Sequence, residues 1–354
     1  MIPNLTGIRG IAALWVLAYH FKEYYSGLFP SFNLLEPIVS RGYFGVDLFF
    51  CLSGFILAKV YILDFSTTST ISKCLQIKKY LIRRIARIYP IYFLTFLAAA
   101  IFYGFAIKVG HSFNHESASN LSIENVVLNV LIMQAWFDVP SLNGPAWSVS
   151  AEIGAYLIFP VFLWSFTRKV FANKFRVALI LILSIIWNQV SLYHDIFLNR
   201  SMNRVFSEFL SGLCLFFLCR GVNFQNHYVL MARSILNASI LATLILVNNE
   251  FILSTLMPVL LLLLVAANSI ANIPGKGMGR GFLLKLGLWS YSLYLSHRLL
   301  QNIMSGLGLP IYSSELLINW FQFGLLIFLP IAIAAAITHL IEIPMRKFIL
   351  DKFS

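Results

Sequence analysis

The sequence predicts an all-α integral membrane protein, a single bundle of about ten transmembrane helices with both termini in the cytoplasm. Hydrophobic residues make up 59% of the 354 residues and charged residues only 11%, whereas soluble domains carry roughly 25% charged residues. The apolar residues gather in long runs, and a helix needs about 20 of them to cross a bilayer. A membrane β-barrel would show short segments in which apolar and polar residues alternate.

The apolar runs define the elements in order. They lie at residues 8–27, 42–63, 88–107, 146–166, 175–192, 205–220, 229–247, 251–270, 282–302 and 316–341. Between these runs there is no linker and no long stretch of a different amino-acid composition. We therefore expect one transmembrane domain over residues 1–354, with no additional soluble domain.

The segment 124–137 is apolar but short, and it contains Asn125, Asn129 and Gln134. With ten spans and a cytoplasmic N-terminus, 18 Lys and Arg residues fall in inside loops and five in outside loops. A further span here would turn 12 of those 18 outward, against the positive-inside rule. We predict an interfacial or re-entrant helix on the outer side. The net charge of +12 is then explained by cytoplasmic loops and does not indicate nucleic-acid binding.

The first span contains two ionisable residues, Arg9 and His20. Such residues cost about 2.5–3.5 kcal/mol each inside a membrane helix on insertion scales, so they indicate function. Their spacing places both on one helix face, ~16 Å apart along the axis. An interfacial anchor and an end-of-helix histidine are the alternative interpretation.

The second span contains Asp47, with Gly45 and Gly54 permitting close helix approach. We expect the carboxylate to pair with Arg9 or to orient His20. A polar group near the outer end of the span is the alternative.

Arg83, Arg84 and Arg87 stand at the entry of the third span. Arginine suits phosphate oxygens, so these residues are candidates for binding a phosphate-bearing donor. A topology signal or an anchor for anionic lipids is the alternative.

The fourth span opens with Trp147, Ser148 and Glu152, the last two on one helix face. Glu152 is expected at the depth of His20, and a structural ion pair is its alternative. In the sixth span, Arg204 and Glu208 are interpreted as a structural pair.

In the ninth span, Ser290, Tyr294 and His297 share a face, and Tyr291 is their neighbour. They predict a polar stripe toward the bundle interior. A hydrogen-bonded core histidine is the alternative for His297. The sequence predicts no metal site, because the histidine pair at 111 and 115 has no second ligand cluster.

Together and in this order, these motifs resemble those of the membrane-bound acyltransferase-3 family, whose members acylate surface glycans, peptidoglycan, lipids and macrolides. The resemblance covers essentially the whole chain. The motifs are the Arg9 and His20 pair, Gly-Tyr-x-Gly-Val-Asp-x-Phe-Phe-x-x-Ser-Gly-Phe at 42–55, Arg-Arg-x-x-Arg-Ile-x-Pro at 83–90, Trp-Ser-x-x-x-Glu at 147–152, Tyr-Ser-x-Tyr-Leu-x-His at 291–297 and Glu-x-Pro at 342–344. Tyr89 is an additional residue relative to the family's usual motif, so the family's residue roles cannot be assigned one by one within residues 83–90.

The resemblance implies ten spans, an acyl-CoA donor entering from the cytoplasm and essential roles for Arg9 and His20. On this basis Arg83, Arg84 and Arg87 are expected to hold the coenzyme phosphates. His20 is expected to act as general base, oriented by Asp47 or Glu152, with Arg9 or Tyr294 stabilising the oxyanion. Transfer of the acyl group directly to the acceptor and transfer by way of an acylated His20 are both open. The remaining substrate-binding candidates are Trp147, Ser148, Tyr291 and His297.

The expected partners are acyl-CoA (acetyl-CoA first), a carbohydrate or lipid-linked hydroxyl acceptor, and membrane lipids. No permanently bound cofactor and no nucleic acid is expected. The expected location is the bacterial inner (cell) membrane. Two other classes stay open: a transporter or flippase without chemistry, and a structural or sensory subunit. Paired, polar-interrupted helices in matching halves would favour the transporter.

Overall fold

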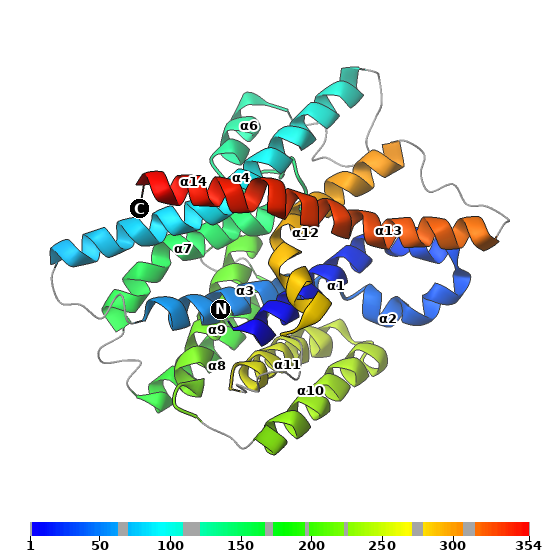
Figure 1. The fold of residues 1–354 in the computed structure, drawn as a ribbon. Helices are drawn as coiled ribbons and strands as arrows, with labels where there is room; N and C mark the ends of the chain where they lie inside the picture. Colours follow the sequence, from blue (N-terminus) through cyan, green and yellow to red (C-terminus); the bar gives the residue numbers. More distant parts are fainter. Residues whose placement is uncertain are drawn as a thin grey trace. The chain divides into compact units, whose positions relative to one another are not determined.

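The computed structural model describes residues 2–62, 70–108, 121–166, 173–194, 198–222, 226–270, 279–306 and 316–353. Over these ranges the regular structure is helical, without strands (Figure 1). The elements are α1 (Pro3–Leu28), η1 (Pro30–Leu35), α2 (Glu36–Val39), α3 (Phe44–Tyr61), α4 (Thr70–Lys108), α6 (Ile123–Val130), α7 (Ala146–Phe166), α8 (Lys174–Ser191), α9 (Arg200–Cys219), α10 (Asn226–Leu246), α11 (Glu250–Ile270), α12 (Gly281–Gly306), α13 (Leu316–Ile337), η3 (Thr338–Glu342) and α14 (Ile343–Phe353).

Each predicted span is helical in the structure, and the protein is an integral membrane protein of the multi-pass helical class. Eight helical segments within the described ranges are long and apolar enough to cross a membrane. The other two predicted spans, α1 and α12, are helices of 26 residues each. That length, ~39 Å, exceeds the hydrocarbon thickness of about 30 Å. Both are less apolar because they carry residues such as His20 and His297.

Two elements refine the prediction. α4 begins at Thr70 rather than at residue 88, because the basic stretch before the apolar run is rich in good helix formers and holds no proline before Pro90. α6 has only eight residues, Ile123–Val130. An eight-residue helix is too short to span a bilayer, so the segment 124–137 is not a transmembrane helix, as predicted.

The helices group into two compact units, each assembled from three stretches of chain. The first unit comprises residues 1–16, 37–77 and 155–288, and the second comprises 17–36, 78–154 and 289–354. The first part of α1 therefore belongs to the first unit, and the remainder belongs to the second.

The first unit contains a close contact between α3 and α9. A Cβ atom added at Gly54 would overlap the carbonyl oxygen of Phe209, and one added at Gly212 would overlap that of Cys51. Gly45 similarly allows α1 to approach, since a Cβ there would lie 2.8 Å from the carbonyl oxygen of Ala12. Small residues let membrane helices pack backbone to backbone, which confirms the close approach predicted at Gly45 and Gly54.

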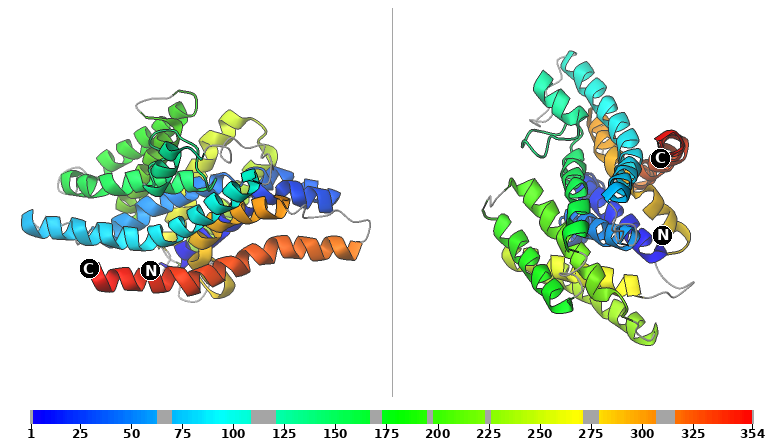
Figure 2. Two further views of the ribbon diagram at one scale, coloured as in Figure 1. Left: turned by 90° about the horizontal axis from the view of Figure 1, so that it is seen from above. Right: turned by 90° about the vertical axis from the view of Figure 1, so that its left-hand side faces the viewer.

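In the second unit, α13, η3 and α14 continue one another as a long helix (Figure 2). Its π-helical turn at η3 places Thr338 and Glu342 beside α12. Ser292 on α12 donates a hydrogen bond to Glu342 at 2.9 Å and accepts one from Thr338 at 2.9 Å. This polar contact joins α12 to the C-terminal helix.

Asn129 organises the segment that leads into α7. Its amide nitrogen donates to the carbonyl oxygens of Asn125 at 2.9 Å and Pro140 at 3.1 Å, and its amide oxygen accepts from the backbone of Leu142 at 3.0 Å. The side chain is fully buried. Backbone groups of an irregular segment need such partners in an apolar environment. The start of α7, with its polar residues, is thereby held in place.

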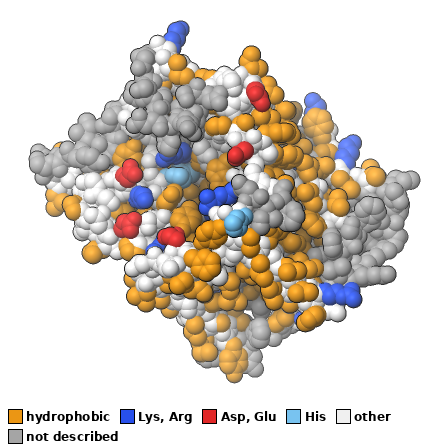
Figure 3. Space-filling model, turned by 180° about the vertical axis from the view of Figure 1, so that it is seen from behind, with side chains coloured by type: hydrophobic (Ala, Val, Ile, Leu, Met, Phe, Trp, Pro, Cys, Tyr) orange, Lys and Arg blue, Asp and Glu red, His pale blue; other side chains and the backbone are white. Residues whose placement is uncertain are grey.

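The surface of the described residues is strongly apolar. On the face drawn in Figure 3, hydrophobic side chains predominate and charged ones are few. Large apolar side chains on the spans are exposed, including Phe105 on α4, Leu246 on α10 and Phe328 on α13. A soluble protein rarely exposes so much contiguous apolar surface, whereas lipid tails accept it.

Candidate active site

Two histidines lie together in the second unit. The ring centroids of His20 on α1 and His297 on α12 are 5.0 Å apart, with 39° between the ring planes. His20 is half-buried, and His297 is 1% exposed. Nδ1 of His297 lies 3.2 Å from the carbonyl oxygen of Leu293. Its Nε2 is buried, and no hydrogen-bond partner for it occurs among the described residues.

A tyrosine and a serine adjoin this pair. The hydroxyls of Tyr294 and Ser148 are hydrogen-bonded to each other at 2.7 Å. Both also lie within hydrogen-bond distance of the carbonyl oxygen of Pro145, at 3.3 Å and 3.0 Å respectively. The ring of Tyr294 is 5.9 Å from that of His297. Ser290 is fully buried on the same helix. The polar stripe predicted on this span is therefore buried, and its contact with Ser148 joins α12 to the start of α7.

A further residue near the histidines is Arg298, which was not among the predicted site residues. Its guanidinium donates to Oε1 of Gln301 at 2.5 Å, and the amide of Gln301 donates to the backbone carbonyl of His20 at 2.6 Å. This chain of contacts fixes α12 against α1 beside the imidazoles. The signal available in the sequence was an arginine inside an apolar span, directly after His297.

The basic run lies on α4, also in the second unit. Arg83 is exposed, whereas Arg84 and Arg87 are half-buried. The hydroxyl of Tyr291 donates a hydrogen bond to the carbonyl oxygen of Ile88 at 2.8 Å, and its role in substrate binding stays a prediction. The first turn of the polar stripe on α12 is therefore attached to α4 one residue beyond Arg87.

Trp147 and Glu152 are half-buried on α7. Glu152 lies one helical turn beyond Ser148 and belongs to the second unit, like His20.

Asp47 lies in the first unit, in an ion pair. Nε of Arg204 is 2.6 Å from the carboxylate of Asp47 and 3.9 Å from that of Glu208. The predicted Arg204–Glu208 pair is therefore present, but the closer partner of Arg204 is Asp47. For Asp47 the sequence predicted pairing with Arg9 or orientation of His20. The ion pair that the structure shows comes from α9, a helix far away in sequence, and no local pattern points to it. The contacts of Asp47 with Arg9 and His20 stay predictions.

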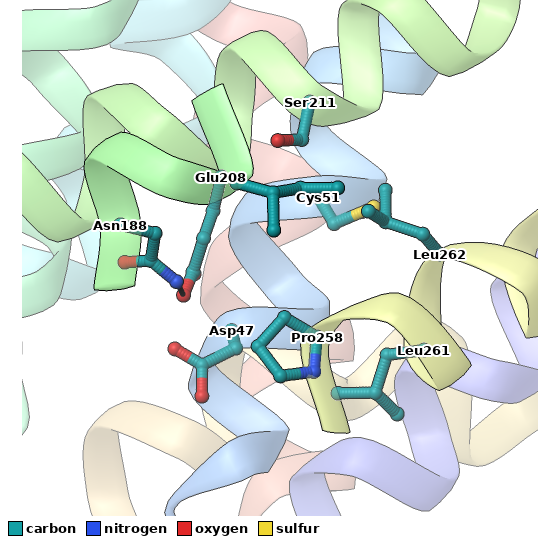
Figure 4. Close-up of a pocket in the computed structure, with 9 residues that line it drawn as sticks. Asp47, Cys51, Asn188, Glu208, Ser211, Pro258, Leu261 and Leu262 are labelled. Atoms are coloured by element: carbon teal, nitrogen blue, oxygen red, sulfur yellow. Dashed lines mark hydrogen bonds between the residues drawn. The ribbon is translucent and has the colours of Figure 1, made fainter. Parts of the chain in front are cut away.

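A small cavity of about 20 Å³ adjoins these carboxylates (Figure 4). Its polar lining comes from Asp47, Asn188, Glu208 and Ser211, and Cys51 also contributes. The amide of Asn188 donates to Glu208 at 3.2 Å. The volume is sufficient for about one water molecule. Cys51 is buried here.

The structure thus brings His20, Ser148, Tyr294 and His297 together in the second unit. Arg9 and Asp47 belong to the first unit, and their participation in chemistry stays a prediction. The histidines at 111 and 115 lie outside the described residues.

Comparison with known proteins gives this geometry a chemical context. A family model for an acyltransferase domain matches residues 2–339. The acyltransferase MdmB of Streptomyces mycarofaciens is 26% identical over 321 residues, covering 84% of this chain and 78% of the relative. An uncharacterised protein of Haemophilus influenzae is 30% identical over 238 residues, covering 65% of this chain and 91% of the relative.

The chain is also similar to enzymes that are much longer. The peptidoglycan O-acetyltransferase OatA of Listeria monocytogenes is 25% identical over 200 residues, which cover 52% of this chain and 28% of the relative. The chain therefore matches only about a quarter of that enzyme's length. No solved structure matches the chain.

Proposed function

The chain belongs to the acyltransferase-3 family and is an integral membrane O-acyltransferase. From this premise, we propose that it transfers an acyl group, acetyl in the first instance, from cytoplasmic acyl-CoA to a hydroxyl of an extracytoplasmic or membrane-associated acceptor, specifically a surface glycan. The observation that carries the proposal is the His20–His297 pair, with ring centroids 5.0 Å apart inside an apolar helical unit. Imidazoles in such surroundings suit proton transfer.

The basic run on α4 supports a coenzyme A donor. Coenzyme A carries several phosphate charges and cannot enter lipid, so its phosphates need cationic partners at the membrane surface. Arg83 and Arg87 stand four residues apart and therefore on one helix face. Arginine forks bind phosphate oxygens with two parallel hydrogen bonds. We assign this run to donor binding.

His20 is the proposed general base. The acceptor hydroxyl gives its proton to neutral His20 as its oxygen attacks the thioester carbonyl, and a tetrahedral oxyanion forms. When the intermediate collapses, the C–S bond breaks and the coenzyme thiolate takes the proton from His20, which regenerates the neutral base. A positioned base contributes typically 10²–10⁴-fold to the rate. The hydroxyls of Tyr294 and Ser148 lie beside the histidines, and in the proposed reaction one of them turns its proton from its present partner toward the oxyanion.

The acceptor assignment rests on the relatives. The Listeria relative is named for O-acetylation of peptidoglycan, a polymer outside the cytoplasmic membrane. This supports the proposal of a bacterial inner-membrane protein with a carbohydrate hydroxyl as its acceptor.

The test uses purified protein in lipid nanodiscs with acetyl-CoA labelled in the acetyl group. Transfer of label to a membrane or glycan fraction of the host, with equal release of coenzyme thiol, is expected. Mass spectrometry of surface glycans with and without the gene should show a difference of one acetyl group. Movement of an unmodified acceptor across vesicles without any labelled product would overturn the proposal in favour of a flippase.

A further inference from the structure

His297 has one ring nitrogen whose role is set by its surroundings. Nδ1 lies 3.2 Å from the carbonyl oxygen of Leu293, one turn earlier on α12. A carbonyl oxygen only accepts hydrogen bonds, so in neutral His297 the ring proton resides on Nδ1. Nε2 is then a hydrogen-bond acceptor with its lone pair in the plane of the ring.

That acceptor is buried and unused. His297 is 1% exposed, and Nε2 lacks a hydrogen-bond partner within the described part of the chain. A buried acceptor left unsatisfied is destabilising, and such a group calls for a functional explanation. The imidazole of His20 adjoins His297, and the centroid separation of 5.0 Å is close to that of two imidazoles joined by one N–H···N bond.

We propose that His297 is a positioning residue for His20. When the acceptor hydroxyl is bound, one N–H of His20 donates to Nε2 of His297, and this leaves the other nitrogen of His20 with its lone pair toward the hydroxyl. The bond fixes the tautomer and ring orientation of His20 and stabilises the imidazolium that forms during transfer. The inference rests on the proposed role of His20 as base.

A neutral imidazole suits this position better than a carboxylate. In soluble enzymes a buried carboxylate commonly orients the catalytic histidine. Inside a membrane an ionised carboxylate adds a charge that must be desolvated. Asp47 is one of the carboxylates predicted to orient His20. In the structure its carboxylate lies in the first unit, 2.6 Å from Nε of Arg204. His297 supplies the acceptor without a charge, and the backbone of Leu293 determines which nitrogen offers it.

The test compares three substitutions of His297. His297→Gln keeps a carbonyl oxygen close to the place of Nε2, whereas His297→Asn has a shorter side chain that cannot reach His20. His297→Phe keeps the ring volume without any acceptor. Asn302→Ala is the matched control, because Asn302 also lies on α12 and donates a hydrogen bond to Tyr103 at 2.6 Å, away from the histidine pair.

Acetyl transfer from acetyl-CoA is measured with wild-type protein and each variant in nanodiscs, together with the melting temperature. We expect His297→Phe and His297→Asn to lower kcat about 100-fold with the KM for acetyl-CoA within twofold of wild type. His297→Gln should stay within tenfold of wild-type kcat, and Asn302→Ala within twofold. If the Phe variant does not fold, the Gln and Asn pair decides alone.

Equal kcat values for His297→Gln and His297→Asn, in a wild-type protein that transfers acetyl groups, would overturn this inference and leave the proposed function intact. A change confined to KM, or to the melting temperature, would also overturn it, because a purely structural or binding role predicts that pattern. A wild-type protein that transfers no acetyl group overturns the proposed function and the inference together.

Discussion

Nε of Arg204 donates a hydrogen bond to the carboxylate of Asp47 at 2.6 Å, so α9 holds the acidic residue of α3. A second hydrogen bond, from Nη2 of Arg204 to the backbone carbonyl of Tyr43 at 3.3 Å, attaches the same guanidinium to the start of α3. Asp47 is nearly fully buried. The pair therefore links two helices where water has little access.

Removing Arg204 should destabilise the protein. Breaking a buried ion pair by removing one partner costs roughly 3–5 kcal/mol, because the other charge stays buried without compensation. Arg204→Ala is expected to lower the melting temperature in detergent by several degrees. Arg200→Ala is the matched control, since Arg200 is exposed on the same helix, and should change it little. Equal melting temperatures for the two variants would show that the pair contributes no stability.

The helical elements of this protein were largely predictable from sequence. Long apolar runs carry a strong signal, and each predicted span is a helix in the structure. The start of α4 was less predictable, because helix formation continues past the apolar run into the basic residues Lys78–Arg87 without a change in backbone geometry. The division into two units was not predictable either, since each unit joins stretches that are far apart in the chain.

The residues of the candidate site could be predicted from the sequence, but most of the contacts between them could not. His20 and His297 are visible as ionisable residues within apolar spans, but nothing in their spacing says that two helices 277 positions apart bring them together. The partner of Asp47 was missed for the same reason. Its pairing with Arg204 depends on the α3–α9 contact, which only packing determines.

The α3–α9 contact should tolerate no added methyl group. Gly54→Ala or Gly212→Ala would place a Cβ against the backbone of the opposite helix. Overpacking typically costs 1–3 kcal/mol, and more where backbone must move. We expect both variants to show a lower yield of folded protein and a lower melting temperature.

Gly104→Ala serves as the control for the glycine variants. A Cβ at Gly104 would have nothing within 4 Å, and alanine is the better helix former. This variant should therefore be as stable as wild type or slightly more so. If the Gly54→Ala protein had the same melting temperature as the Gly104→Ala protein, that result would contradict the close packing of α3 on α9.

Substitution of the basic run should weaken donor binding. Arg83→Ala combined with Arg87→Ala removes two guanidinium groups from one face of α4, and each lost charge-assisted contact is worth about 1.5–3 kcal/mol. The KM for acetyl-CoA is expected to rise at least tenfold with kcat changed less than threefold. Lys78→Ala with Lys79→Ala removes the same charge from exposed positions on the same helix. If both double variants raise the KM for acetyl-CoA equally, the arginines of α4 attract the donor only through their positive charge and do not form a specific phosphate site.

Arg9 is tested by a substitution that keeps its charge. Lysine retains the positive charge of Arg9 but lacks the planar fork with two parallel donors. If Arg9 binds an anionic group bidentately, Arg9→Lys should lower transfer from acetyl-CoA at least tenfold while membrane insertion, assayed by protease protection, stays normal. Near-normal transfer by Arg9→Lys would indicate an interfacial anchor.

The proposed role of His20 as the base for acyl transfer is tested by the rate of labelled acetyl transfer from acetyl-CoA by His20→Ala protein. We expect a loss of at least 10²-fold in kcat, with an elution profile and melting temperature matching those of wild type. Transfer at the wild-type rate by a folded, membrane-inserted His20→Ala protein would contradict it.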